Sequence, residues 1–60
     1  MDSDKRYKEV IKEIESNIEL LKEKLKQHQV KQSKQPENWG FVGDVSYINT
    51  KIENIIETIR

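Results

Sequence analysis

The sequence predicts an all-α protein, an antiparallel helical hairpin that pairs with a second copy into a four-helix bundle. Two heptad-spaced apolar stripes predict the two helices, and a segment between them that holds the proline and both glycines predicts the connection. The short chain of 60 residues predicts the pairing, because a chain of this size buries too little surface to be very stable alone. We expect residues 1–60 to form a single domain.

The first stripe predicts a long helix over about residues 4–29. Its apolar residues are separated alternately by four and three positions, which places them on one side of a helix. They occupy the a and d positions of a heptad register, and His28 takes the next d position. Asp4 suits the positive end of the helix dipole. The stripe consists of Tyr7, Ile11, Ile14, Ile18, Leu21 and Leu25.

A change in composition follows this helix and predicts a loop over about residues 30–43. Pro36 disfavours helical geometry at Gln35, so we expect the first helix to end before this point. The loop contains the only proline, tryptophan and phenylalanine of the chain and both of its glycines. Because the aromatic residues show no helical period, we expect Trp39 and Phe41 to lie in a structured turn rather than on a helix face.

The second stripe predicts a shorter helix over about residues 44–60, with Asp44 as its N-cap. At 1.5 Å per residue this helix would be about 25 Å long and the first about 40 Å, so part of the longer helix would stay uncovered. The apolar residues of the second stripe alternate three and four positions apart. They are Val45, Ile48, Ile52, Ile55 and Ile59.

Pairing with a second copy follows from how much apolar surface these helices can cover. Two helices that face each other cannot fully bury either stripe, whereas a second copy would cover both. Isoleucine at both a and d positions of the second stripe also disfavours a two-stranded coil and favours more helices. We therefore expect a homodimer, with the residues of both stripes as its core or dimer seam. The alternatives are a different protein that completes the core and a monomer closed by the loop.

The composition argues against several classes of function. The eleven basic and eleven acidic residues cancel, so no net positive charge points to nucleic acid or to an anionic membrane. The chain has no cysteine and a single histidine, and we expect neither a metal site nor a cofactor. No nucleophile–base pair, glycine-rich phosphate loop or carboxylate pair is recognisable, so we expect no enzyme activity.

The hydropathy of the chain bears on its location. No apolar run approaches the roughly 18 residues of a membrane-spanning helix. The N-terminal segment Met1–Arg6 lacks the apolar core of a signal peptide. We therefore expect no membrane-spanning segment and a cytoplasmic protein.

Trp39, Phe41 and Val42 form the candidate partner-binding surface. Tryptophan is enriched at the centres of protein interfaces, so an exposed Trp39 would be a binding hot spot. The structural alternative is that the aromatic residues close the end of the bundle as a plug. Both are compatible in a dimer where the plug of one copy packs on the other. The predicted function is a non-enzymatic interaction module, a homodimeric regulator or inhibitor that binds another, unidentified protein.

A second interpretation is a nucleic-acid-binding regulator that uses a lysine-rich segment. Residues 24–35 are rich in lysine and glutamine and contain no acidic residue. However, we expect the lysines at 24, 31 and 34 not to share one narrow helix face, and arginine, the usual base reader, is absent there. The alternative is a solvated helix end whose cations suit the negative end of the helix dipole. The candidate residues are Lys24, Lys26, Lys31 and Lys34.

Two resemblances to known families accompany this interpretation. The segment Asn38–Asp44 (NWGFVGD), which leads into a helix, resembles a turn found in small, poorly characterised proteins of phages and plasmids, which implies an origin in a mobile element. The arrangement of two antiparallel helices that pair into a bundle is similar to the Rop family of plasmid RNA-binding regulators. That similarity is one of architecture alone, and the predicted long loop departs from the tight turn of Rop. RNA binding is therefore not carried over.

Overall fold

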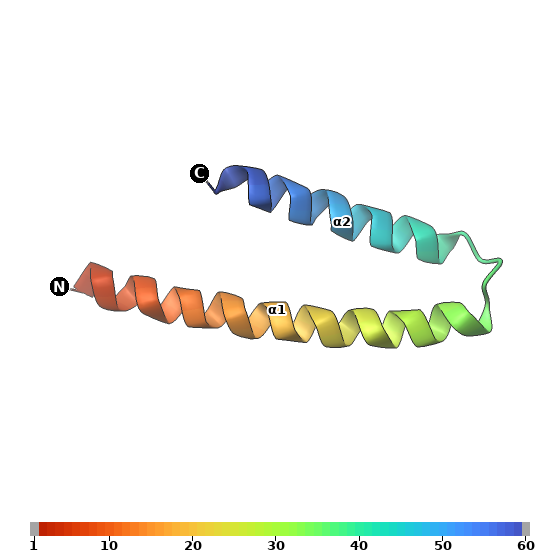
Figure 1. Ribbon diagram of the computed structural model, residues 1–60, viewed down its shortest axis with the longest axis horizontal. Coiled ribbons are helices and arrows are strands. Elements are labelled where there is room, and N and C mark those ends of the chain that lie inside the picture. Colours follow the sequence, from red (N-terminus) through yellow and green to blue (C-terminus); the bar gives the residue numbers. More distant parts are fainter. Residues whose placement is uncertain (1, 60) are drawn as a thin grey trace.

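The computed structural model describes residues 2–59, which form two α-helices and no strand (Figure 1). Helix α1 spans Asp2–Lys34 and helix α2 spans Gly40–Thr58. The chain reverses direction between them, and the two helices run in opposite directions (Figure 1). The described residues measure 53 × 21 × 11 Å, so the molecule is a pair of rods rather than a globule. The predicted all-α class is confirmed.

Helix α1 is longer than the sequence pattern predicted. It was expected to end near residue 29 but continues to Lys34. Residues 30–34 include two lysines and one glutamine, which are good helix formers, and neither glycine nor proline occurs before Pro36. Lys31 and Lys34 in the last turn also interact favourably with the negative end of the helix dipole. At its other end α1 begins at Asp2, two residues before the predicted start.

Helix α2 begins earlier than predicted. It starts at Gly40, so the predicted loop over residues 30–43 is too long and the predicted N-cap role of Asp44 is wrong. Glycine is a poor helix former, which is why the sequence predicts a loop here, yet neither glycine adopts a positive φ. The N-cap position is Trp39, whose side chain makes no capping hydrogen bond. One residue earlier, Asn38 Oδ1 accepts a hydrogen bond from the backbone N of Gly40 at 2.9 Å, which satisfies one free donor at the start of α2.

The C-terminal end of α2 also differs from the prediction. The helix ends at Thr58, and Ile59 is already extended, with φ −86° and ψ 124°. Its backbone N still donates to the carbonyl of Ile56 at 3.2 Å. Arg60, the last residue of the predicted helix, lies outside the described residues.

The two glycines differ in the space around them. A Cβ added at Gly40 would lie 3.0 Å from Asn38 Oδ1, which accepts a hydrogen bond from the Gly40 backbone N. A Cβ added at Gly43 would meet nothing within 4 Å. The absence of a side chain therefore matters at Gly40, where it leaves room for the Asn38 side chain, and not at Gly43.

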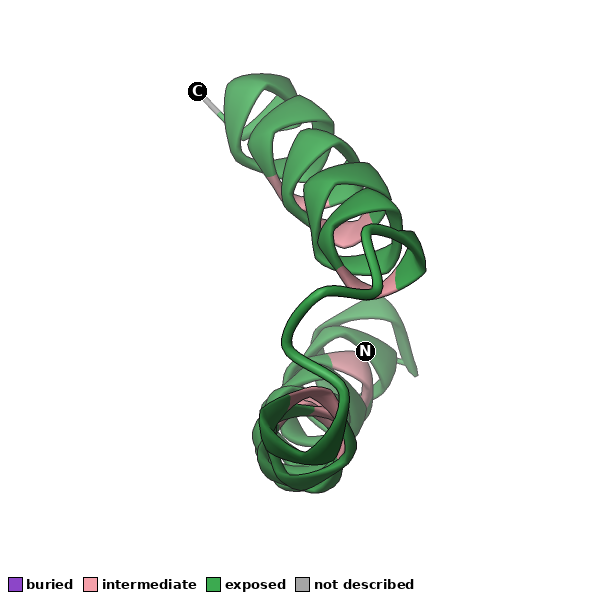
Figure 2. Ribbon diagram, turned by 90° about the vertical axis from the view of Figure 1, so that its right-hand side faces the viewer, coloured by how far each residue is buried: buried purple, intermediate pink, exposed green. Residues whose placement is uncertain are grey.

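Within residues 2–59 no side chain is fully buried (Figure 2). The half-buried residues of α2 and most of those of α1 lie toward the turn. Away from the turn the helices diverge (Figure 1), and there Ile18 is 47% exposed and Ile59 is 74% exposed. One copy therefore holds its two stripes together only near the turn. The half-buried residues are Val10, Leu21, Leu25, His28, Gln32, Phe41, Ile48 and Ile52.

The outer surface of α1 carries mixed charge. Arg6 Nη1 lies 3.4 Å from Glu9 Oε2, and Lys22 Nζ lies 3.4 Å from Glu19 Oε1. In each pair the two residues are three positions apart on the helix. Such solvent-exposed pairs contribute little to stability. Neither helix in the described part of the chain combines the length and apolar character needed to cross a membrane.

Candidate interaction surface

The turn between the helices is stabilised by its own hydrogen bonds. The backbone N of Gln35 donates to the carbonyl of Gln32 at 3.0 Å, and that of Asn38 donates to the carbonyl of Gln35 at 3.0 Å. The side-chain amide of Asn38 donates to Gln35 Oε1 at 3.3 Å. The backbone N of Gly43 donates to the carbonyl of Trp39 at 3.1 Å, which ties Trp39 to the first turn of α2. The position of Trp39 is therefore set by backbone hydrogen bonds.

The side chain of Trp39 projects into solvent. It is 79% exposed, more than any other large apolar side chain in residues 2–59. Val42, three residues further on, is also exposed, and residues at this spacing are neighbours on a helix surface. Trp39 and Val42 thus form an exposed apolar pair at the turn. In one copy the ring of Trp39 is left in solvent and does not plug the end of the hairpin, and its role as a plug in the bundle stays a prediction.

Phe41, by contrast, is half-buried and packs against α1. Its ring meets that of His28 edge to face, with centroids 5.2 Å apart and an interplanar angle of 87°. Phe41 also lies four residues before Val45, so it continues the apolar stripe of α2. This spacing is visible in the sequence, and the prediction missed it because Gly40 and Gly43 suggested a loop. Of the two aromatic residues of the turn region, Phe41 is the one that closes the fold.

His28 joins the two helices by a hydrogen bond as well. Its Nε2 lies 3.0 Å from Asp44 Oδ2, and within residues 2–59 no other side-chain hydrogen bond connects α1 with α2. The His28 side chain is 21% exposed, which agrees with its predicted d position in the heptad register. Asp44 therefore contacts α1 instead of capping α2. Nowhere in the described part of the chain do three His, Cys, Asp or Glu side chains gather to hold a metal ion.

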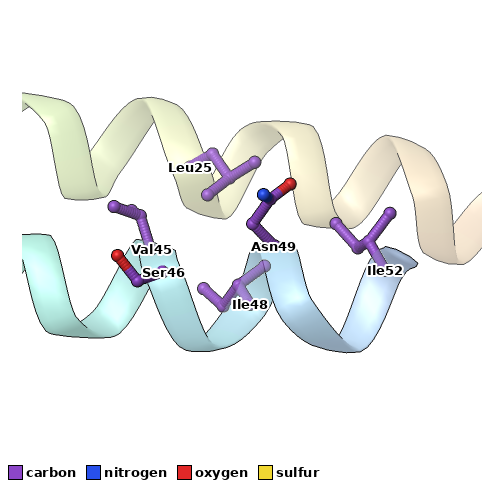
Figure 3. A pocket seen from close by; sticks show the side chains of 6 residues that line it. All are labelled: Leu25, Val45, Ser46, Ile48, Asn49 and Ile52. Carbon is purple, nitrogen blue, oxygen red and sulfur yellow. The ribbon is translucent and has the colours of Figure 1, made fainter. Parts of the chain in front are cut away.

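A shallow apolar groove lies between the helices next to this contact (Figure 3). Leu25 projects from α1 toward Ile48 and Ile52 of α2. Asn49 is a polar member of the lining, and its Nδ2 donates to Glu53 Oε1 at 3.2 Å. The groove is lined by Leu25, Val45, Ser46, Ile48, Asn49 and Ile52.

The structure brings together only part of the predicted seam. Leu21 and Leu25 of α1 and Ile48 and Ile52 of α2 are half-buried. The other predicted seam residues remain exposed in one copy, and all but Ile59, which follows α2, lie on the two helices. They are Tyr7, Ile11, Ile14, Ile18, Val45, Ile55 and Ile59.

The candidate nucleic-acid residues all lie on α1 and are exposed; they are Lys24, Lys26, Lys31 and Lys34. Because α1 continues to Lys34, a helical turn of 100° per residue places Lys24, Lys31 and Lys34 within about 80° of arc. Lys26 lies on a different side. The expectation that these three lysines do not share a face is therefore wrong.

Comparison of the chain with protein-family models, with curated proteins and with solved structures found no significant match in any of the three. The resemblances to phage and plasmid proteins and to Rop stay predictions. The connection between the helices, residues 35–39, is shorter than the predicted loop over residues 30–43. The length of that predicted loop was the stated difference from the tight turn of Rop.

Replacing Phe41 with alanine should lower the free energy of unfolding by about 1–2 kcal/mol, because a half-buried ring and its contact with His28 are lost. Trp39→Ala is the matched control. It should change the free energy of unfolding by less than about 0.5 kcal/mol, because the ring of Trp39 is exposed. Urea unfolding followed by circular dichroism at one fixed protein concentration measures both. An equal loss for the two variants would contradict the assignment of Phe41 as the packed ring.

Proposed function

We propose that the protein is a non-enzymatic interaction module in which two copies pair into a four-helix bundle and the exposed turn of each copy binds another protein. The observation that carries this proposal is the presence of two apolar stripes with no fully buried residue in residues 2–59 of one copy. Contiguous exposed apolar surface of this kind is typical of association sites. A regulatory or inhibitory role would follow from occupying the surface of the bound protein.

Self-association is supported by the position of the exposed stripe residues. They concentrate where α2 diverges from α1, and include Ile14, Ile18 and Ile55. A second copy supplies residues of the same size at the same heptad spacing, which is the requirement for knobs-into-holes packing. Isoleucine at a and d positions of α2 further favours an assembly of more than two helices.

The dimer should appear on a size-exclusion column with light scattering as a species near twice 7.2 kDa. Its helix content, followed by circular dichroism, should fall on dilution, because the folded form is stabilised by association. Ile18→Lys should shift the protein to monomer and lower its helix content, because it places a charge in the seam. A helical monomer at every concentration would contradict the dimer.

Leu20→Lys is the matched control for that experiment. Leu20 lies two residues after Ile18 on α1, is 56% exposed against 47% for Ile18, and lies off the seam. The dimer should therefore persist in this variant. If Leu20→Lys dissociated the protein as fully as Ile18→Lys, general loss of apolar surface rather than the seam would explain both results.

The proposed contact with another protein is the pair Trp39 and Val42. Tryptophan contributes a large contact area with few rotatable bonds, which makes it a frequent hot spot. Here the ring is exposed on a hydrogen-bonded turn, so little conformational freedom of the backbone would be lost on binding. The pair lies outside the stripes, so that bundle formation and partner binding use separate surfaces.

Trp39→Ala and Val42→Ala should abolish retention of a protein that the wild type captures in a pull-down from cells of the source organism. Tyr47→Ala is the control, because Tyr47 is also an exposed aromatic residue of α2, with Lys51 Nζ 5.3 Å from its ring centroid. The control should keep the captured protein. Retention of every captured protein by both turn variants would show that the surface is wrongly assigned.

The alternative function is a nucleic-acid-binding regulator, and the shared face of Lys24, Lys31 and Lys34 favours it. Replacing these three lysines with glutamine should weaken binding to pooled DNA and RNA, and binding should fall steeply with added salt. Lys26→Gln, on a different side of α1, should have a smaller effect. Electrophoretic mobility shifts measure both, and absence of binding at low salt would remove this alternative.

A further inference from the structure

Charge is unevenly distributed along α1, although the chain as a whole is neutral. Residues 2–19 contain six acidic and four basic residues, a formal net charge of −2. Residues 20–34 contain five lysines and one glutamate, a formal net charge of +4. The helix is therefore acidic in the half far from the turn and basic in the half that reaches it.

The exposure of the seam of α1 changes along the same direction. Leu21, Leu25 and His28, in the basic half, are half-buried beneath α2. Ile14 and Ile18, in the acidic half, are exposed. The half of α1 that most needs an apolar cover is thus the half with net negative charge.

We infer that the second copy packs on the first through α1 in antiparallel orientation, an inference that rests on the proposed homodimer. This orientation places the basic half of each α1 beside the acidic half of the other. A parallel pair would instead set the two halves of charge +4 side by side. Helices in contact are 8–10 Å apart, about one Debye length at physiological salt, so the attraction and the repulsion are only partly screened.

The heptad spacing of the stripe accommodates this orientation. Intervals that alternate between three and four positions are symmetric about the midpoint of every interval, so the position of the axis is taken from the charge of α1, which changes sign between Glu19 and Leu20. A two-fold axis that passes α1 at that point places Ile18 opposite Leu21 of the second copy and Ile14 opposite Leu25. Farther from the axis, Ile11 lies opposite His28, and Tyr7 lies opposite the polar Gln32. The central part of the seam is therefore self-complementary about this axis, as a two-fold interface requires.

The orientation can be measured with nitroxide labels, because the chain has no cysteine of its own. Glu9, Ser16, Glu23 and Val30 are seven residues apart, are all exposed, and lie on the side of α1 away from the seam. Each is replaced singly by cysteine and labelled, and the label-to-label distance in the dimer is measured by double electron–electron resonance. Circular dichroism checks that each labelled variant folds.

Antiparallel packing about this axis predicts a symmetric pattern of distances. Labels at 16 or 23 should be separated by about 10 Å along the helix axis, and labels at 9 or 30 by about 30 Å. Four similar distances would mean parallel packing and overturn the orientation while leaving the dimer intact. A shortest distance at 9 or 30 would overturn the proposed axis. No dipolar signal together with a monomeric mass would instead mean that the homodimer itself is wrong.

Discussion

The structure depends on the need to cover two apolar stripes that one pair of helices cannot bury. The stripes follow heptad spacing over both helices, but α2, with 19 residues, is much shorter than α1, with 33. Near the turn the stripes meet, and Phe41, His28 and Asp44 join the helices through an edge-to-face contact and a hydrogen bond. Beyond that region the helices diverge, and their isoleucines stay exposed. Association is the direct way for such surfaces to leave water.

The turn separates two aromatic residues that are only two positions apart in the sequence. Helix α2 begins at Gly40, between Trp39 and Phe41, and Asn38 Oδ1 accepts a hydrogen bond from the Gly40 backbone N at its start. Phe41 then falls on the apolar stripe and packs on His28, whereas Trp39 precedes the helix and points into solvent. One short segment thereby supplies both a packing residue for the hairpin and an exposed ring, the proposed contact with another protein.

The periodic parts of the fold could be predicted from the sequence, and the helix ends could not. Heptad spacing indicated both helices and their apolar faces, because burial on one side of a helix leaves a regular pattern. Gly40 and Gly43 predict a loop, yet both lie in α2 without a positive φ, and the backbone N of Gly40 is hydrogen-bonded to Asn38 Oδ1. For the same reason Phe41 was not included in the predicted apolar stripe of α2. The helix face that Lys24, Lys31 and Lys34 share was also missed in the prediction from sequence. The different environments of Trp39 and Phe41 depend on where α2 begins, and neither side chain by itself indicates that position.

Because no side chain in residues 2–59 is fully buried in one copy, the amount of protein present would affect how the proposed regulator folds. When folding and association are one event, the folded fraction depends on total protein concentration through mass action. Below the dissociation constant most chains would be unfolded and open to proteolysis, and above it most would be folded and protected. A modest change in synthesis rate would then produce a larger change in active protein. Gene dosage itself would set the threshold at which the protein acts.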